Sequence, residues 1–287
     1  MATIRNPIEW ALDEFKLSAL ALRLTGRSIR GPQASPDSSL PAVRRIAVAD
    51  LRDVLVRGFE DFGACRTDVI FIIIIYPLAG LVLARLAFQH DMLPLLFPLA
   101  SGFALIGPIA AVGLYEMSRR REQGLEVSWG DAFRIVGSPS FGAILVLGFL
   151  LLAILLLWLV TAQVIYVLTL GPEPPTSISA FVSDVFTTTA GWAMIVVGVG
   201  VGFLFAVVVL AISVVSFPLL LDRDVGLSNA VGTSVRSVIA NPRPMAVWGL
   251  IVAGGLVLGT IPLFLGLIII LPVLGHATWH LYRKVVQ

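Results

Sequence analysis

The chain has 287 residues, of which 57% are hydrophobic and only 13% charged, and its formal net charge is +2. A soluble domain has about a quarter of its residues charged. The composition therefore excludes an ordinary soluble protein and predicts an integral membrane protein. The single cysteine, Cys65, excludes a disulfide within the chain.

Residues 1–47 predict a cytoplasmic N-terminal region made of an amphipathic helix and a flexible linker. Apolar residues recur at steps of three and four over 7–24, and arginines follow. Residues 31–41 are rich in proline and serine, which is typical of a linker. The helix has two open interpretations: it lies on an anionic lipid leaflet, or it packs on the protein's own cytoplasmic loops.

Residues 48–287 predict a membrane domain with six spans. A spanning helix needs about 20 mainly apolar residues, and six stretches qualify: 69–89, 93–116, 140–169, 190–221, 243–260 and 262–282. Every lysine and arginine except Arg85 lies in the segments 1–66, 117–139, 222–243 and 283–287, which precede and follow the pairs of spans along the chain. Because positive residues stay in the cytoplasm, we expect both termini to be cytoplasmic.

The six spans group into three related helical hairpins, over about 48–116, 128–221 and 227–287. A short amphipathic helix precedes each hairpin on the expected cytoplasmic side, at 48–64, 128–136 and 227–240. The first has an apolar stripe of Val48, Leu51, Leu55, Phe59 and Phe62, and the last one of Leu227, Val231, Val235 and Val238. We therefore expect an all-α six-transmembrane-helix bundle built from three hairpins, each preceded by a cytoplasmic amphipathic helix.

Each even-numbered span contains a proline near its cytoplasmic end: Pro108, Pro218 and Pro272. A proline within a helix frees the carbonyl four residues earlier, here those of Ala104, Val214 and Ile268. In transporters, such broken helices line a binding cavity. The alternative is that the three prolines only bend helices to shape the bundle.

Several motifs together resemble a family of bacterial membrane proteins. They are Val127-Ser-Trp-Gly-Asp-Ala-Phe133, Leu105-Ile-Gly-Pro108 with Tyr115-Glu116, and Leu271-Pro-Val-Leu-Gly-His276. The chain is similar in these motifs to the uncharacterised integral membrane family DUF2189, over about residues 45–285. The resemblance implies a place in the bacterial inner membrane, with no established activity.

Few residues carry chemistry. His276 and His280 are four apart and share a helix face, with Glu116 as the carboxylate expected at their depth. Zinc takes three or four ligands, so interfacial histidines are the alternative to a metal site, and we expect no metal or cofactor. Arg85 is costly within a span and marks either a functional site or a side chain that reaches the headgroups.

Two classes of function fit these observations. The first is a non-enzymatic scaffold or accessory protein of a membrane complex, which suits the glycine pairs Gly198/Gly202 and Gly255/Gly259, since small residues let helices approach closely. The second is a transporter of small molecules or lipids with its site at the three prolines. The expected partners are the lipid bilayer and a membrane protein or second copy, with no nucleic acid and no enzymatic activity.

Overall fold

The computed structural model describes residues 41–64, 90–127, 135–262 and 265–287. The expected N-terminal helix and linker, the 69–89 span, Cys65, Arg85 and most of the 128–136 helix lie outside these residues. The described part of the chain is helical, apart from one bridge between Val43 and Val286. Its elements are α2 (Asp50–Ala64), η2 (His90–Leu95), α4 (Leu96–Ala110), α5 (Val112–Glu122), α6 (Phe141–Thr169), α7 (Ile178–Thr187), α8 (Thr189–Ser213), α9 (Ser216–Asp222), α10 (Leu227–Ala240), α11 (Pro242–Thr260) and α12 (Leu267–Val285).

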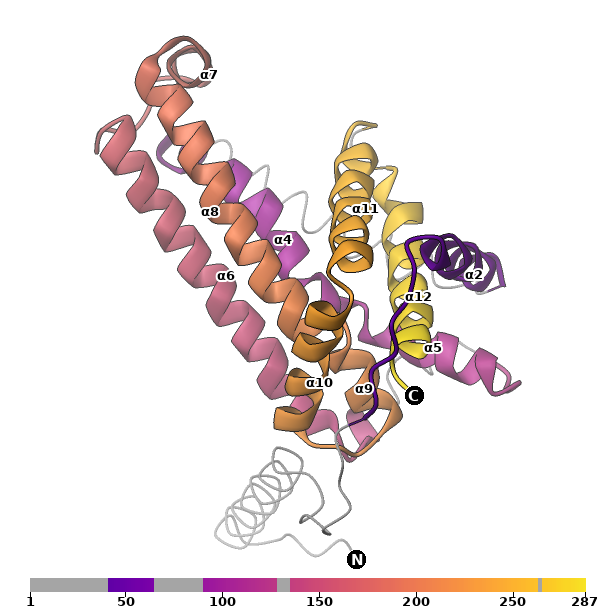
Figure 1. Cartoon of the computed structure of the whole chain (residues 1–287). Helices are drawn as coiled ribbons and strands as arrows, with labels where there is room; N and C mark the ends of the chain where they lie inside the picture. Colours follow the sequence, from indigo (N-terminus) through magenta and orange to yellow (C-terminus); the bar gives the residue numbers. More distant parts are fainter. Residues whose placement is uncertain (1–40, 65–89, 128–134, 263–264) are drawn as a thin grey trace, which may run out of the picture.

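Three helical segments of the described chain are long and apolar enough to cross a membrane. They are Phe141–Thr169, Thr189–Asp222 and Pro242–Thr260, and they match three of the six expected spans. Figure 1 shows α6 and α8 running side by side away from the rest of the molecule, with α4 beside them and α7 at their far end. The membrane-length helices are therefore confirmed at these three places.

The division into six spans remains a prediction. The expected 93–116 span is divided at Ala111 between α4 and α5, and α4 alone has 15 residues, about 22 Å of helix. The expected 262–282 span corresponds to α12, which begins at Leu267 and ends with Arg283 and Lys284 in its last turn. Neither segment is among the three membrane-length helices.

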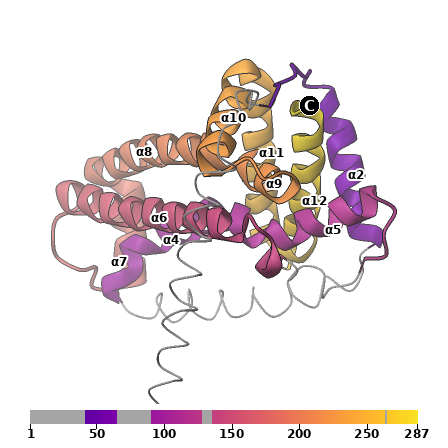
Figure 2. The same cartoon turned by 90° about the horizontal axis from the view of Figure 1, so that it is seen from below.

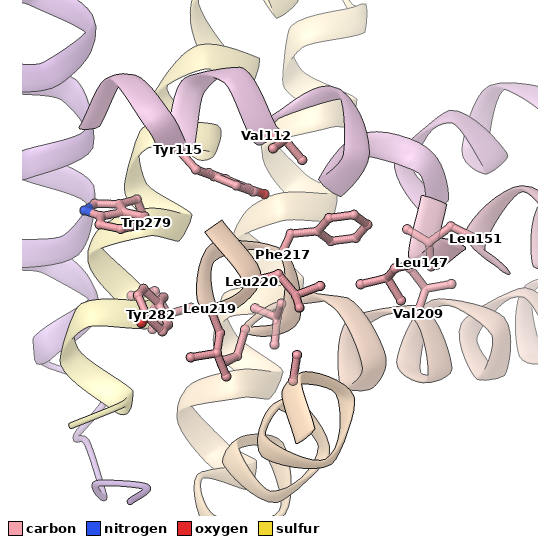
Figure 3. Packing of buried hydrophobic residues seen from close by; sticks show 14 of the residues in the cluster. Val112, Tyr115, Leu147, Leu151, Val209, Phe217, Leu219, Leu220, Trp279 and Tyr282 are labelled. Carbon is pink, nitrogen blue, oxygen red and sulfur yellow. The ribbon is translucent and has the colours of Figure 1, made fainter. Parts of the chain in front are cut away.

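The hydrophobic core lies around the short helix α9, between α12 and the paired helices α6 and α8 (Figure 3). Phe217, Leu219 and Leu220 of α9 are at most 1% exposed. Figure 3 shows them between Trp279 and Tyr282 of α12 on one side and residues of α6 and α8 on the other. The core therefore joins the α6–α8 pair to α12.

The first and last described helices, α2 and α12, pack along each other (Figure 2). Gly58 permits this, because a Cβ atom there would lie 2.7 Å from the Cβ and backbone nitrogen of Ala277 and from the carbonyl oxygen of Val273. Residues 42–46, which we call the strap, lead into α2. The strap bonds to the end of α12 through Arg44 N to Val285 O, at 2.7 Å.

Asn241, at the joint between α10 and α11, holds the other side of the strap. Its Oδ1 accepts from the backbone nitrogen of Ile46 at 2.8 Å, and its Nδ2 donates to the carbonyls of Arg44 and Ser237. Asn241 is only 2% exposed. One buried amide thus ties the chain before α2 to the start of α11.

The helical chain is interrupted shortly before Pro218, which itself lies inside α9. Val214 and Val215 separate α8 from α9, and the backbone nitrogen of Val215 donates instead to the buried Ser234 Oγ of α10, at 3.2 Å. Pro108 and Pro272 lie inside the uninterrupted helices α4 and α12. The three prolines therefore do not have the same effect on their helices.

The apolar stripes of α2 and α10 are not the most buried faces of these helices. The buried face of α2 consists of Leu51, Val54, Gly58 and Asp61, whereas Val48 is 45% and Phe59 60% exposed. In α10 the buried residues are Ala230, Thr233, Ser234 and Ser237. Close helix contact favours small residues such as these. The bounds of α10 match the expected ones. Of the stripe residues, Leu51 is buried, and Leu55, Leu227, Val231 and Val238 are partly buried against the core.

Candidate functional site

A buried polar cluster lies where α2, α5 and α12 meet, and we call it the Asp61 junction. It consists of Asp61 from α2, Ser118 and Arg121 from α5, and His276 and His280 from α12. Asp61 is 5% exposed, Ser118 1% and His276 0%. Helix α2 delivers Asp61 one turn after Gly58, where the close approach to α12 brings it beside both histidines.

Three side chains bind the Asp61 carboxylate. Ser118 Oγ donates to Oδ2 at 2.6 Å, His280 Nε2 lies 2.8 Å from the same oxygen, and Arg121 Nη1 donates to Oδ1 at 2.7 Å. A buried carboxylate is costly unless it is paired and hydrogen-bonded. Here the charge is compensated by partners on two other helices.

The hydrogen bonds also fix the state of His276. Ser118 has one hydroxyl hydrogen, which it gives to Asp61, so its oxygen must accept at the 2.8 Å contact with His276 Nδ1. His276 therefore carries a hydrogen on Nδ1. The order of the chain of hydrogen bonds is His276, Ser118, Asp61 and then His280.

The pKa of Asp61 is lowered from its ordinary value of 3.8. Burial alone would raise it, but the hydrogen bonds from His280 and Ser118 and the charges of both histidines lower it by more. The carboxylate is therefore ionised at neutral pH. It serves as an acceptor and is not a proton donor there.

A second polar cluster continues from the Asp61 junction along α12 toward its C-terminal end. Glu122 accepts from Trp279 Nε1 at 3.0 Å and from Arg283 Nε at 3.1 Å. Asp222 accepts from the Tyr282 hydroxyl at 2.6 Å and lies 3.5 Å from Arg283 Nη1. These contacts attach α12 to α5 and to the end of α9.

An open depression of about 380 Å³ lies beside the Asp61 junction. It is lined by Asp53, Val56, Arg57, Glu60, Asp61, Arg121, Glu122 and His280. Asp53 pairs with Lys284 at 2.9 Å and with Arg57 at 3.3 Å, the second being the contact expected from their spacing. Most of the charges in the depression are thus already used within the protein.

The sequence-predicted site residues are only partly brought together. His276 and His280 share the Asp61 junction, but Glu116 does not join them: it is 3% exposed and binds Arg119 through both carboxylate oxygens, at 2.7 and 2.9 Å. Arg85 lies outside the described residues. Among the described residues, no group of three histidine, cysteine, aspartate or glutamate side chains could hold a metal ion.

The residues at the proline positions have unlike surroundings. Ala104 is exposed, Ile268 is half-buried and Val214 is buried in the core. Pro108 is half-buried, whereas Pro218 and Pro272 are buried. None of the six lines the depression beside Asp61. Whether these carbonyls face a cavity in the working protein stays a prediction.

Asp61 and Ser118 were not predicted from the sequence as site residues. Asp61 was overlooked because the apolar stripe expected for α2 pointed elsewhere, and Asp61 is 219 residues away from its partner His280. One signal was present in the sequence: two histidines at helical spacing in an apolar segment. Histidines that become buried need a hydrogen-bond partner such as an acidic or hydroxyl side chain.

The central part of the chain is similar to a known protein family. Residues 96–222 match DUF2189, a family described as predicted integral membrane proteins. The match confirms the family that the motifs resembled, over a shorter stretch than the 45–285 expected. No curated protein and no solved structure matches the chain. Over residues 96–222 the chain is similar to DUF2189, and its described part contains three helices long and apolar enough to cross a membrane. The chain is therefore an integral membrane protein.

Proposed function

We propose that the protein is a non-enzymatic scaffold or accessory component of a membrane complex, held in the bacterial inner membrane with both termini in the cytoplasm. The observation that carries the proposal is the exposure of the Thr189–Asp222 segment. Of its most apolar stretch of 18 residues, only 6% is buried within the protein. The corresponding share for Phe141–Thr169 is 39%. The segment packs on α6, α7 and α10 along one side, and its other side is exposed in the described part of the chain, so that face can take another helix.

That face can be defined by residues. Val196 is 68% and Phe203 64% exposed, and both lie at helical spacing on the side of α8 away from Trp158 of α6, which packs near Gly202 and against Phe205. Gly200 lies on the same outward side, and a Cβ atom added to it would have no atom within 4 Å. A small residue between larger ones allows close approach of a second helix.

The Asp61 junction supports the non-enzymatic part of the proposal. Ser118 is buried between a carboxylate and an imidazole, and it gives its hydrogen to Asp61. A serine nucleophile needs its hydrogen on a base and its oxygen accessible to a substrate. The junction instead has the properties of a structural fastener between three helices.

Native mass spectrometry of the protein, mildly extracted from its own membranes, tests the proposal. We expect a stoichiometric protein partner, or a second copy, whose occupancy falls in Gly200→Leu. Val197→Leu, on the flank of the same helix and 47% exposed, is the matched control and should keep the partner. A tightly held lipid or small molecule without any protein would instead favour a transporter or lipid-handling protein.

A further inference from the structure

An exposed basic surface surrounds the joint between α10 and α11. Arg44 and Arg45 lie on the strap, Arg236 lies near the end of α10, and Arg243 lies in the first turn of α11. All four side chains are exposed. We call these four residues the basic rim.

The fold brings these residues together from distant parts of the sequence. Arg236 Nη2 donates to the carbonyl of Pro41 at 3.0 Å, just before the strap. Asn241 holds the backbone of Arg44 and Ile46, and Arg243 follows Asn241 by two residues. The arrangement thus depends on the buried amide and does not follow from the sequence alone.

The basic rim is not neutralised by ion pairs within the described chain. The basic residues that pair with described carboxylates are others: Arg57, Arg119, Arg121, Arg223, Arg283, Lys284 and His280. Of the four rim arginines, Arg236 donates to a backbone carbonyl. No described carboxylate therefore competes with an external anion for the charges of the rim.

The rim also lies at the level where a membrane surface is expected. Arg243 is the second residue of the membrane-length helix Pro242–Thr260, and Ile239, four residues earlier near the end of α10, is 72% exposed. The N-terminal end of α11 adds the positive end of a helix dipole. Arginines beside an exposed apolar residue at the start of a span match the boundary between headgroups and hydrocarbon.

We propose that the basic rim binds the phosphate headgroup of an anionic phospholipid, in the leaflet at the N-terminal end of α11. Guanidinium groups bind phosphate through paired hydrogen bonds, and basic residues next to a span attract anionic lipids. The strap would then be held by Asn241 from one side and by lipid from the other. This site is separate from the exposed face of α8.

The test uses the full chain, purified, stripped of lipid and titrated with phosphatidylglycerol or phosphatidylcholine under native mass spectrometry. We expect the protein to retain phosphatidylglycerol in preference to phosphatidylcholine, and Arg45→Gln with Arg243→Gln to weaken that binding by about tenfold or more. Neither side chain makes a hydrogen bond to another described residue, so the pair of changes spares the fold. Lysine at both positions should restore the preference, because it keeps the charge.

Arg57→Gln is the matched control, since it removes one exposed charge already paired with Asp53. It should leave lipid retention unchanged. The proposal is overturned if the double glutamine variant keeps its phosphatidylglycerol, if Arg57→Gln lowers retention equally, or if the arginine changes release a protein partner while lipid retention stays the same.

Discussion

His280 Nε2 lies 2.8 Å from Asp61 Oδ2, so that a side chain near the end of α12 binds one on α2 across 219 residues of sequence. The same oxygen accepts from Ser118 of α5. Three helices therefore share one carboxylate oxygen. If the Asp61 junction holds α2 on α12, loss of the Asp61 carboxylate should destabilise mainly α2.

Asp61→Asn should loosen α2 from α12. The change keeps the shape but removes the charge that Arg121 and His280 face, and hydrogen bonds to charged groups contribute about 1.5–3 kcal/mol each. We expect faster hydrogen exchange across 50–64 and a lower Tm. Asp53→Asn is the control: its carboxylate is largely exposed and its ion pairs should contribute at most about 1 kcal/mol. Equal effects of the two changes would contradict the role of Asp61.

Acid should weaken the same junction. Because the pKa of Asp61 is below 3.8 in the folded protein, the carboxylate stabilises the docked state above pH 3.8, and this contribution is lost as the pH falls through the lower folded value. The charged and titratable neighbours are Arg121 of α5 and His276 and His280 of α12. Tm measured from pH 7 to pH 3 should fall more steeply below pH 4 in the wild type than in Asp61→Asn. Parallel curves would show that other groups govern acid sensitivity.

Gly58→Ala should be among the most damaging small changes in α2. The new methyl group would lie 2.7 Å from the Ala277 backbone and Cβ, which cannot move without shifting α12. Gly63→Ala in the same helix has no atom within 4 Å and should be neutral or stabilising, since alanine favours helix by roughly 0.5–1 kcal/mol. Thermal unfolding of both variants in detergent checks the contrast, which fails if Gly58→Ala unfolds no earlier than Gly63→Ala.

Asn241→Ala should release the strap. The change removes the amide that bonds to Ile46, Arg44 and Ser237, and the loss of hydrogen bonds at these buried and partly buried groups should cost about 1 kcal/mol or more. Limited proteolysis should then cut within 42–46 before it cuts elsewhere in the described chain. Asn229→Ala, at a half-buried position of the same helix α10, serves as the control and should leave the strap protected.

The sequence predicts the local parts of this fold better than their assembly. The bounds of α10 match the expected 227–240, and α6 matches the expected span at 140–169, because helix length and apolar content are local properties. The faces of α2 and α10 could not be predicted in the same way. Which side packs depends on small residues such as Gly58 and Ser234, which allow close contact with partners far along the chain.

The candidate site shows the same division. The spacing of His276 and His280 predicted that they share a face. Both belong to the Asp61 junction, where His276 contacts Ser118 and His280 contacts Asp61. Their partner could not be found from spacing, because a carboxylate on α2 becomes a neighbour only once α2 has docked on α12. Glu116, the carboxylate expected there, is instead held by Arg119 three residues away, where a local partner is closer.

The docking of α2 on α12 sets an order of events during synthesis. Asp61 leaves the ribosome 219 residues before His280, which at about 5–20 residues per second is a delay of roughly ten to forty seconds. During that time α2 lacks its close contact at Ala277 and the His280 partner of Asp61, whereas Ser118 and Arg121 follow Asp61 by only 57 and 60 residues. In the nascent protein, α2 therefore exists without its largest helix contact until α12 has been synthesised.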